Sequence, residues 1–189
     1  MGARATGVAS TRERVTRAAR RLYLDQAFED VTLASIAAAA GVSHQTVLNH
    51  FESKDGVLLA VAEMLRDETV QIRHAAPPGD VAGAIHALVD DYEQMGDANI
   101  RWIVASERVP TLAALLDEAR SGHQEWLQAM FGASMPDTPA AGDRTLHALH
   151  AATDVYTWKL LRRDLRLSRT ETEATIVDLV VGALRGATP

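Results

Sequence analysis

Residues 32–54, TLASIAAAAGVSHQTVLNHFESK, constrain the fold more than any other segment, because they predict two short helices joined by a tight turn. Gly41 can adopt the left-handed conformation that ends a helix, Ser43 is a good N-cap for the next helix, and Thr32 plays the same part for the first one. Small and apolar side chains fall at helical spacing on the inner face: Leu33, Ile36, Ala37, Ala40, Val47 and Phe51. The pattern is typical of a helix-turn-helix, whose second helix enters the major groove of DNA.

An ordinary helical hairpin with a glycine turn would share this pattern, so the flanking sequence matters. A helix with an apolar stripe precedes the motif and ends near residues 26–28, which completes a three-helix domain. After the motif, Ser53 can cap a new helix at Lys54, where the positively polarised helix end favours phosphate. We expect a flexible arm over residues 1–10, a DNA-binding domain over 11–54 and an effector-binding and dimerisation domain over 55–189.

The outward face of the second helix carries the side chains that we expect to meet DNA. Gln45 and Asn49 suit paired hydrogen bonds with adenine, and Thr46 and Leu48 suit contact with a thymine methyl group. For His50, a phosphate contact and a packing or capping role remain equally open. The predicted DNA-contacting residues are Thr32, Ser43, His44, Gln45, Thr46, Leu48, Asn49, His50 and Lys54.

In this region the chain resembles the TetR family of helix-turn-helix transcriptional regulators. The resemblance rests on Ala18, Ala19, Phe28, Thr32, Ile36, Ala37, Gly41, Val42, Ser43, Thr46, Phe51, Ser53, Lys54 and the pair Leu58-Leu59. At Leu48 the chain departs from the family, which usually has a phosphate-contacting tyrosine there. The resemblance implies a sequence-specific DNA-binding regulator, best taken as a repressor, that a small-molecule effector releases from its operator.

Charge is divided unevenly along the chain. Residues 1–54 carry a net charge of +2 and residues 55–189 a net charge of −8, within a total of −6. The local field of the N-terminal domain must therefore carry DNA binding. Exposed arginines on the first helix could approach phosphates, although a solvated helix face is an even alternative: Arg12, Arg14, Arg17, Arg20 and Arg21.

Several functional classes lack their required residues. The chain has no cysteine, no glycine-rich phosphate motif and no recognisable Ser-His-Asp signature, so we expect neither an enzyme nor a cofactor. No apolar run approaches the length of a bilayer span, and residues 1–10 lack the apolar core of a signal peptide, so we expect a cytoplasmic protein without a membrane partner. The alternative function is a helical ligand-binding or scaffolding protein without specific DNA binding.

The remainder predicts an all-α fold of about nine helices in total. Breaks at residues 77–79, 96–97, 110, 132–142 and 167–168 separate helices over 54–74, 80–95, 98–107, 111–131, 143–166 and 169–184. Ser168 and Glu171 form a capping-box pattern. The last helix is apolar on more than one side, which favours either burial within one subunit or a partner. With the resemblance, it implies a homodimer through the last two helices and a palindromic or near-palindromic operator.

The resemblance also implies a small-molecule effector bound between the central helices, and the helix from Lys54 to His74 would then act as the lever. Candidate side chains combine an apolar body with a polar tip, and for each a core role is at least an equal alternative: Tyr92, Trp102, His123, Trp126, His147, His150, Tyr156 and Trp158. His147, His150 and Asp154 fall at i, i+3 and i+7 on one predicted helix face, where they could hold a polar group of the effector or a metal ion, so Asp154 is a further effector candidate. Because only that helix contributes, we predict no metal site there.

Overall fold

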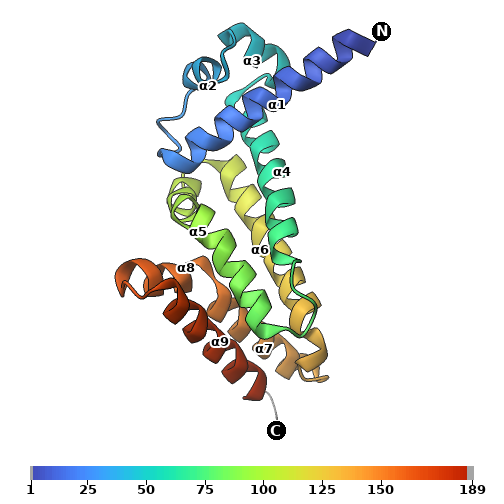
Figure 1. The fold of residues 1–189 in the computed structure, drawn as a ribbon, viewed down its shortest axis with the longest axis vertical. Helices are drawn as coiled ribbons and strands as arrows, with labels where there is room; N and C mark the ends of the chain where they lie inside the picture. The colour runs from blue at the N-terminus through green and yellow to red at the C-terminus, as the bar shows by residue number, and fades with distance from the viewer. Residues whose placement is uncertain (1, 187–189) are drawn as a thin grey trace. The chain divides into compact units, whose positions relative to one another are not determined.

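A computed structural model describes the backbone of residues 2–186 and the side chains of residues 10–186, and its regular structure is entirely helical over that range (Figure 1). The helices are α1 (Gly2–Asp25), α2 (Leu33–Ala40), α3 (His44–Phe51), α4 (Lys54–Arg73), α5 (Val81–Ser106), α6 (Pro110–Phe131), α7 (Pro139–Thr153), α8 (Val155–Lys159) and α9 (Arg169–Arg185). A 3-10 turn covers Gly132–Ser134 and a π-helix covers Leu160–Asp164. The predicted all-α class is confirmed. None of the described helices is long and apolar enough to cross a membrane.

The chain divides into two compact units. Unit 1 comprises residues 1–67 and 101–115, and unit 2 comprises residues 68–100 and 116–189. Helices α4, α5 and α6 each contribute residues to both units. The predicted domains, with limits at residues 11, 54 and 55, were defined by their expected functions, whereas these units are defined by packing. The domain limits therefore stay a prediction.

Unit 1 has a core of small and aromatic side chains drawn from α1 to α4. Tyr23 of α1 is fully buried and stacks on Phe28, with 5.5 Å between the ring centroids. Other fully or almost fully buried members are Val15, Ala18, Ala19, Ile36, Val47, Phe51, Val57 and Val61. Burying each larger side chain contributes roughly 1.5–3 kcal/mol, which offsets the cost of ordering helices as short as α2 and α3.

Contacts between residues far apart in sequence attach α5 and α6 to α1 and α4 within unit 1. Arg101 of α5 donates a hydrogen bond to the Leu24 carbonyl near the end of α1. The Thr111 hydroxyl at the start of α6 donates to the Asp55 carboxylate at 2.6 Å. Unit 1 is therefore larger than the three-helix domain that sequence patterns predict.

Unit 2 is built around α5 and closed by α6 to α9. Ile85, Leu88 and Val89 of α5 are fully buried. The facing helices bury Leu127, Phe131, Leu149, Trp158, Ile176 and Val180. Helices α7 and α9 pack directly against each other.

Helix α1 begins earlier than expected. We predicted a flexible arm over residues 1–10, whereas α1 extends back to Gly2. Ala3, Ala5 and Ala9 are strong helix formers, and the helix core from Val15 onward gives them a template to continue. Met1 lies outside the described residues.

The predicted break at Gly96-Asp97 is wrong, because α5 runs without interruption from Val81 to Ser106. Gly96 serves packing there. A Cβ atom at position 96 would lie 2.3 Å from the Trp158 ring, so only glycine allows this approach. The glycine is thus explained by packing against Trp158, which lies 62 residues away in sequence.

The predicted single helix over 143–166 is also wrong. Helix α7 starts at Pro139, where proline suits the first helical turn, and ends at Thr153. Asp154 has an extended backbone (ψ 151°), and its carboxylate accepts the Tyr156 backbone N–H at 2.8 Å to cap α8. The chain then passes through the π-helix, where the Leu165 N–H donates to the Leu160 carbonyl at 2.8 Å.

Candidate nucleic-acid interface

The turn between α2 and α3 has the capping geometry that the sequence predicts. The Thr32 hydroxyl accepts the Ser35 N–H at 3.0 Å, and the Ser35 hydroxyl accepts the Thr32 N–H at 3.0 Å. Gly41 adopts the left-handed conformation (φ 63°, ψ 39°). The Ser43 hydroxyl accepts the Thr46 N–H at 3.1 Å at the start of α3. These contacts satisfy backbone groups that would otherwise be left free at two helix ends.

Helix α3 presents a polar face and buries an apolar one. Val47 and Phe51 are buried as predicted. Among the predicted DNA-contacting residues, Thr32, Ser43, His44, Gln45 and Asn49 are exposed, whereas Thr46, Leu48, His50 and Lys54 are half-buried. Ser43, His44 and Gln45 lie at the N-terminal end of α3, which is the part of a recognition helix that meets base edges. Thr32 caps α2, and Asn49 lies one turn after Gln45.

Two side-chain pairs organise this polar face. Gln45 Nε2 donates a hydrogen bond to Asn49 Oδ1 at 2.9 Å, one helical turn further along. The hydroxyls of Ser43 and Thr46 share a hydrogen bond of 2.8 Å. The face is therefore ordered before any ligand arrives.

Arg12 of α1 holds the C-terminal end of α3. Its guanidinium donates to the His50 carbonyl at 2.7 Å and lies over the Phe51 ring, 4.4 Å from the centroid. The His50 ring packs at a tilt on Phe51, with 6.3 Å between centroids. The sequence pattern predicted either a phosphate contact or a solvated helix face for Arg12. Nothing in the local pattern could reveal an anchoring contact between residues 38 positions apart.

The Lys54 side chain, which we expected to face a phosphate, also makes contacts within the protein. Its ammonium donates to the Phe28 carbonyl at 2.8 Å and lies 4.2 Å from the centroid of the Phe28 ring. Burial lowers the pKa of Lys54 from its ordinary value, against the opposing effect of nearby carboxylates such as Glu29. One of its three N–H groups is thus used to join the start of α4 to the segment before α2.

The exit from α3 has a constrained backbone that sequence patterns did not reveal. Glu52 has a positive φ of 65°, and the Ser53 N–H donates to the Phe51 carbonyl at 2.7 Å across it. A Cβ atom on Gly56 would lie 2.0 Å from that same carbonyl oxygen. The Ser53 hydroxyl accepts the Gly56 N–H at 3.1 Å, as its predicted capping role requires.

The arginines of α1 do not act as one group. Arg12, Arg14, Arg17 and Arg21 are exposed, and Arg20 is half-buried. Arg17 pairs with Glu13 at 2.5 Å one turn earlier, which uses part of its charge within the helix. Such an exposed pair contributes little to stability.

A buried polar network occupies the core of unit 2, where the effector candidates were expected. Arg73, the last residue of α4, donates to Asp91 through Nε and Nη2, each at 2.8 Å from Oδ2. Its Nη1 lies 2.7 Å from His123 Nδ1, which must accept because a guanidinium only donates. His123 Nε2 then donates to the Thr153 hydroxyl at 2.9 Å, and that hydroxyl donates to the Leu149 carbonyl at 2.7 Å.

This arrangement keeps His123 neutral. Burial, followed by the charges of Arg73 and His150, lowers the pKa of His123 to about 2. Burial is the largest single influence on the pKa of Arg73 and would lower it. The combined effects of Tyr92 and Asp91 are stronger, so the pKa is raised above its ordinary value. The network therefore holds one charged pair and one neutral imidazole in a region shielded from water.

Most of the other predicted effector residues use their polar atoms inside the protein. The Tyr92 hydroxyl donates to the Thr153 carbonyl at 3.0 Å, and Trp126 Nε1 donates to the Arg73 carbonyl at 3.1 Å. Trp158 Nε1 donates to Glu93 at 3.1 Å. Trp102 is buried and belongs to unit 1, whereas the residues of the network belong to unit 2.

The predicted face of His147, His150 and Asp154 does not form as expected. Asp154 lies beyond the end of α7, and His147 is exposed. His150 Nε2 still lies 3.6 Å from the Asp154 carboxylate. No group of three potential metal ligands occurs among the described residues.

Comparison with known proteins bears on the N-terminal part of the chain. Residues 15–61 match the model of a family described as bacterial regulatory proteins, tetR family. The HTH-type transcriptional regulator AlkX of Mycobacterium tuberculosis is 33% identical over 81 residues, which cover 43% of this chain and 38% of AlkX. The chain thus spans less than half the length of that relative.

Two further matches extend over almost the whole chain at lower identity. The HTH-type transcriptional repressor AcnR of Corynebacterium glutamicum is 19% identical over 178 residues, with 93% of each chain covered. The crystal structure of a tetR-family transcriptional regulator from Streptomyces coelicolor has a TM-score of 0.75 and 18% identity, and the match covers 95% of this chain and 88% of that one. This likeness concerns the fold.

Proposed function

Since this chain belongs to the TetR family of bacterial regulatory proteins, we propose that it is a cytoplasmic transcriptional regulator that binds operator DNA through α3. The observation that carries the proposal is the doubly capped helix-turn-helix, with an exposed polar face on α3 and its far end held by Arg12. A helix fixed in this way can enter the major groove with little further ordering.

The DNA contacts follow from the chemistry of each side chain. The amide pair of Gln45 and Asn49 is proposed to form the surface that reads A·T pairs at the contacted positions of the operator, with Thr46 and Leu48 beside thymine methyl groups. Thr32, Ser43, His44 and the backbone at the two helix starts are proposed to meet phosphates. His50 supports α3 through its packing on Phe51, although its half-buried ring can still approach a phosphate.

For Lys54 the proposed role is now twofold. One N–H joins it to the Phe28 carbonyl, and two N–H groups remain to meet a phosphate. This position at the start of α4 keeps the positive charge beside a helix end that also favours an anion.

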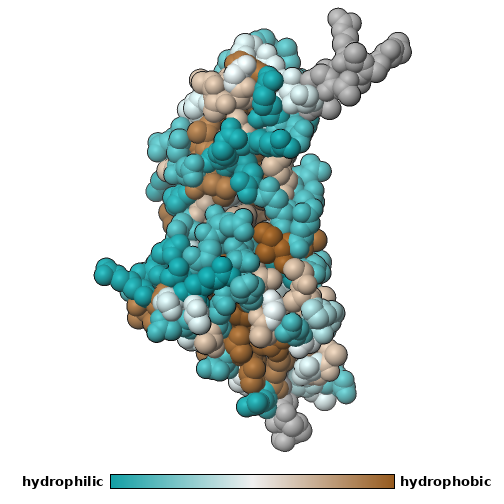
Figure 2. All heavy atoms as spheres, in the orientation of Figure 1, coloured by the Kyte–Doolittle hydropathy of each residue, from teal (hydrophilic) through white to brown (hydrophobic). Residues whose placement is uncertain are grey.

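A homodimer through α8 and α9 would give two recognition helices for two half-sites. Tyr156, Leu160 and Leu179 lie on these elements or the π-helix between them, and 45–56% of the surface of each is exposed. Figure 2 shows hydrophobic residues gathered toward the lower end of the view, in the region of α9. Exposed apolar side chains in one region are typical of a protein interface.

We further propose that the protein is a repressor and that a small molecule releases it from DNA. The buried network supports this, because Arg73 ends the helix that begins at Lys54 and is held by Asp91 and His123. A ligand that competes for these bonds would free the end of α4 and shift its equilibrium position, which is a two-state mechanism. The half-buried His150, whose ring lies 4.9 Å from that of His123, is the nearest candidate to meet such a ligand.

Selection of DNA from a random pool by the purified full-length protein tests this function. We expect a palindromic sequence to be enriched and its binding to weaken with rising salt. Gln45→Ala should weaken binding selectively at one or two operator positions, whereas Gln124→Ala, an exposed change on α6, should leave the preference unchanged. If no sequence is enriched, the protein is instead a ligand-binding or scaffolding protein, and the proposal fails.

A further inference from the structure

The hydrogen bond between Gln45 and Asn49 bears on how the operator is read, and the inference rests on the proposed function. Both side chains are exposed on α3, at i and i+4. Gln45 Nε2 is the donor and Asn49 Oδ1 the acceptor, at 2.9 Å. The two amides are therefore one connected unit on the surface that faces the bases.

The direction of this bond decides what each amide can still offer. A bidentate contact with adenine needs one acceptor for the N6 amino group and one donor for N7. Gln45 keeps its Oε1 acceptor and its second Nε2 hydrogen, so it retains both. Asn49 has its carbonyl oxygen engaged and offers mainly N–H donors.

The bond also restrains a flexible side chain. Glutamine is among the side chains that lose the most rotamer freedom when they are ordered. A partner that orders it before binding lowers this entropic cost. Asn49 is well placed for this, because i and i+4 positions are neighbours on a helix surface.

We propose that Asn49 is a positioning residue for Gln45, so that the two amides together specify a single A·T base pair in each half-site. Asn49 acts through its Oδ1 atom, and Gln45 makes the contact with adenine. The alternative, in which Gln45 and Asn49 each specify a base pair of their own, predicts a different pattern of operator dependence.

The test measures base preference position by position. The operator is first obtained by selection with the wild-type protein, and each base pair of one half-site is then replaced in turn. Dissociation constants are measured for the wild type, Gln45→Ala, Asn49→Leu, Asn49→Asp and the double variant Gln45→Ala/Asn49→Leu. Leucine matches asparagine in size and removes the acceptor, whereas aspartate keeps an acceptor oxygen and removes the donors.

We expect Gln45→Ala and Asn49→Leu to reduce discrimination at the same base pair, each about tenfold. The double variant should be no less selective than Gln45→Ala alone, because the two residues act as one unit. Asn49→Asp should bind all sequences more weakly through repulsion by phosphate, yet keep the preference at that pair. Binding to a nonspecific duplex and the unfolding midpoint should be unchanged in Asn49→Leu, which separates positioning from a structural defect.

Three results would overturn the proposal. Asn49→Leu could reduce discrimination at a different base pair, with effects that add to those of Gln45→Ala. It could leave discrimination unchanged everywhere. Asn49→Asp could lose the preference as fully as Asn49→Leu, which would mean that Asn49 acts through its donors. In each case the wild type remains a selective DNA-binding protein, whereas a wild type that enriches no sequence removes the proposed function and this inference together.

Discussion

At the exit from α3, two residues hold backbone geometry that few side chains tolerate. Glu52 takes a positive φ, and the Phe51 carbonyl is directed at the backbone of Gly56. Turns in which an i+2 N–H returns to the carbonyl across a residue of positive φ are rare and strained, and such strain often lies near functional sites. Here it lies at the junction between α3 and α4.

Gly56→Ala should destabilise the protein by about 1–3 kcal/mol, because its Cβ would overlap the Phe51 carbonyl. The matched control is Gly122→Ala on α6, where a Cβ meets nothing within 4 Å and should stabilise the helix by about 0.5–1 kcal/mol. Denaturant unfolding measures both. Equal effects of the two substitutions would contradict the steric argument.

His123 should make stability depend on pH. Its folded-state pKa is lowered to about 2, mainly by burial, whereas the unfolded chain binds the proton near 6.5. The unfolded state therefore gains protons first, and stability falls as pH drops below about 6.5, by at most about 1.4 kcal/mol per pH unit.

His123→Gln keeps an acceptor for Arg73 and a donor for Thr153 but removes this titration. Urea unfolding between about pH 7 and pH 5 should show a shallower loss of stability in this variant than in the wild type. Gln124→Ala, an exposed change on the same helix that removes no titratable group, should retain the wild-type slope. An unchanged slope in His123→Gln would show that the histidine is not kept neutral.

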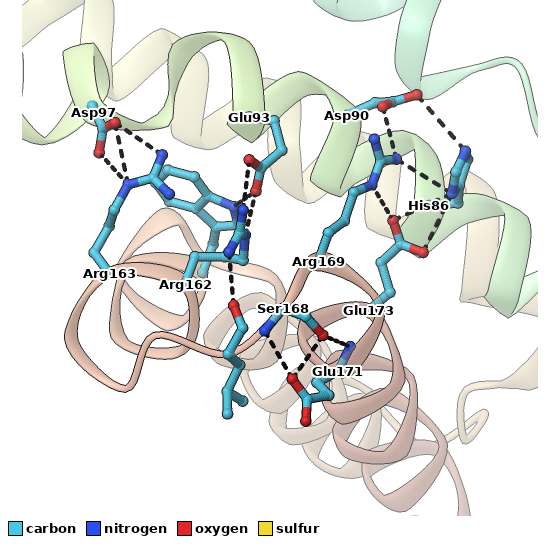
Figure 3. Close-up of polar contacts among 12 residues, drawn as sticks. His86, Asp90, Glu93, Asp97, Arg162, Arg163, Ser168, Arg169, Glu171 and Glu173 are labelled. Carbon is cyan, nitrogen blue, oxygen red and sulfur yellow. Dashed lines mark hydrogen bonds and ion pairs between the residues drawn. The ribbon is translucent and has the colours of Figure 1, made fainter.

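At the scale of elements, α5 is the support on which α8 and α9 are fixed within unit 2. Figure 3 shows four side chains of α5 facing three arginines. The α5 residues are His86, Asp90, Glu93 and Asp97, and the arginines are Arg162 and Arg163 of the π-helix and Arg169 of α9. Arg162 binds Glu93 through two bonds of 2.6 and 3.0 Å, and Arg163 binds Asp97 at 2.9 Å. Arg169 binds Asp90 at 2.7 Å.

The bidentate contact also affects titration. Hydrogen bonding from Arg162 lowers the pKa of Glu93 below its ordinary value, against the effect of burial. The stability that this contact contributes is therefore present above the ordinary glutamate pKa and is lost as pH falls through the folded-state value. These pairs are partly exposed, and Asp97 is more than half exposed, so each contributes modestly to stability. Together they connect the π-helix and α9 to α5.

Gly96→Ala should separate helix propensity from packing. Alanine favours a helix by up to about 1 kcal/mol, but its Cβ would overlap the Trp158 ring, which costs about 1–3 kcal/mol. We expect a net loss of stability in thermal or denaturant unfolding. In a Trp158→Phe background the same substitution should cost less, because the ring atoms that it meets are absent. Equal costs in both backgrounds would place the cause elsewhere.

At the scale of the whole molecule, the apolar side chains left exposed on α8, the π-helix and α9 carry the prediction of a dimer. Leu179→Lys should convert the protein to a monomer in sedimentation analysis, because a charge would be buried without a partner. Val104→Lys is the control, since Val104 is 66% exposed and belongs to unit 1, whereas α8 and α9 belong to unit 2. A dimer that persists in Leu179→Lys would contradict an interface through α9.

The sequence by itself determined the features that arise within a few residues. The caps at Thr32, Ser43 and Ser168 and the left-handed Gly41 form as predicted, because each depends on hydrogen bonds or sterics inside one helical turn. The all-α class follows equally from local periodicity. Residues 15–61, which include the helix-turn-helix, match the model of the family that the same residues indicated.

Only the tertiary structure decided what distant residues do to one another. Lys54 meets Phe28 across 26 positions, Arg12 meets His50 across 38, and Arg73 meets His123 across 50. Helical periodicity and capping rules act over about four residues, so no local pattern can reveal such partners. For the same reason, the local pattern at Gly96 predicted a helix break, whereas the glycine allows the Trp158 ring to pack against an unbroken helix. Several effector candidates of unit 2 likewise have their polar atoms hydrogen-bonded within the protein, which the local sequence did not reveal.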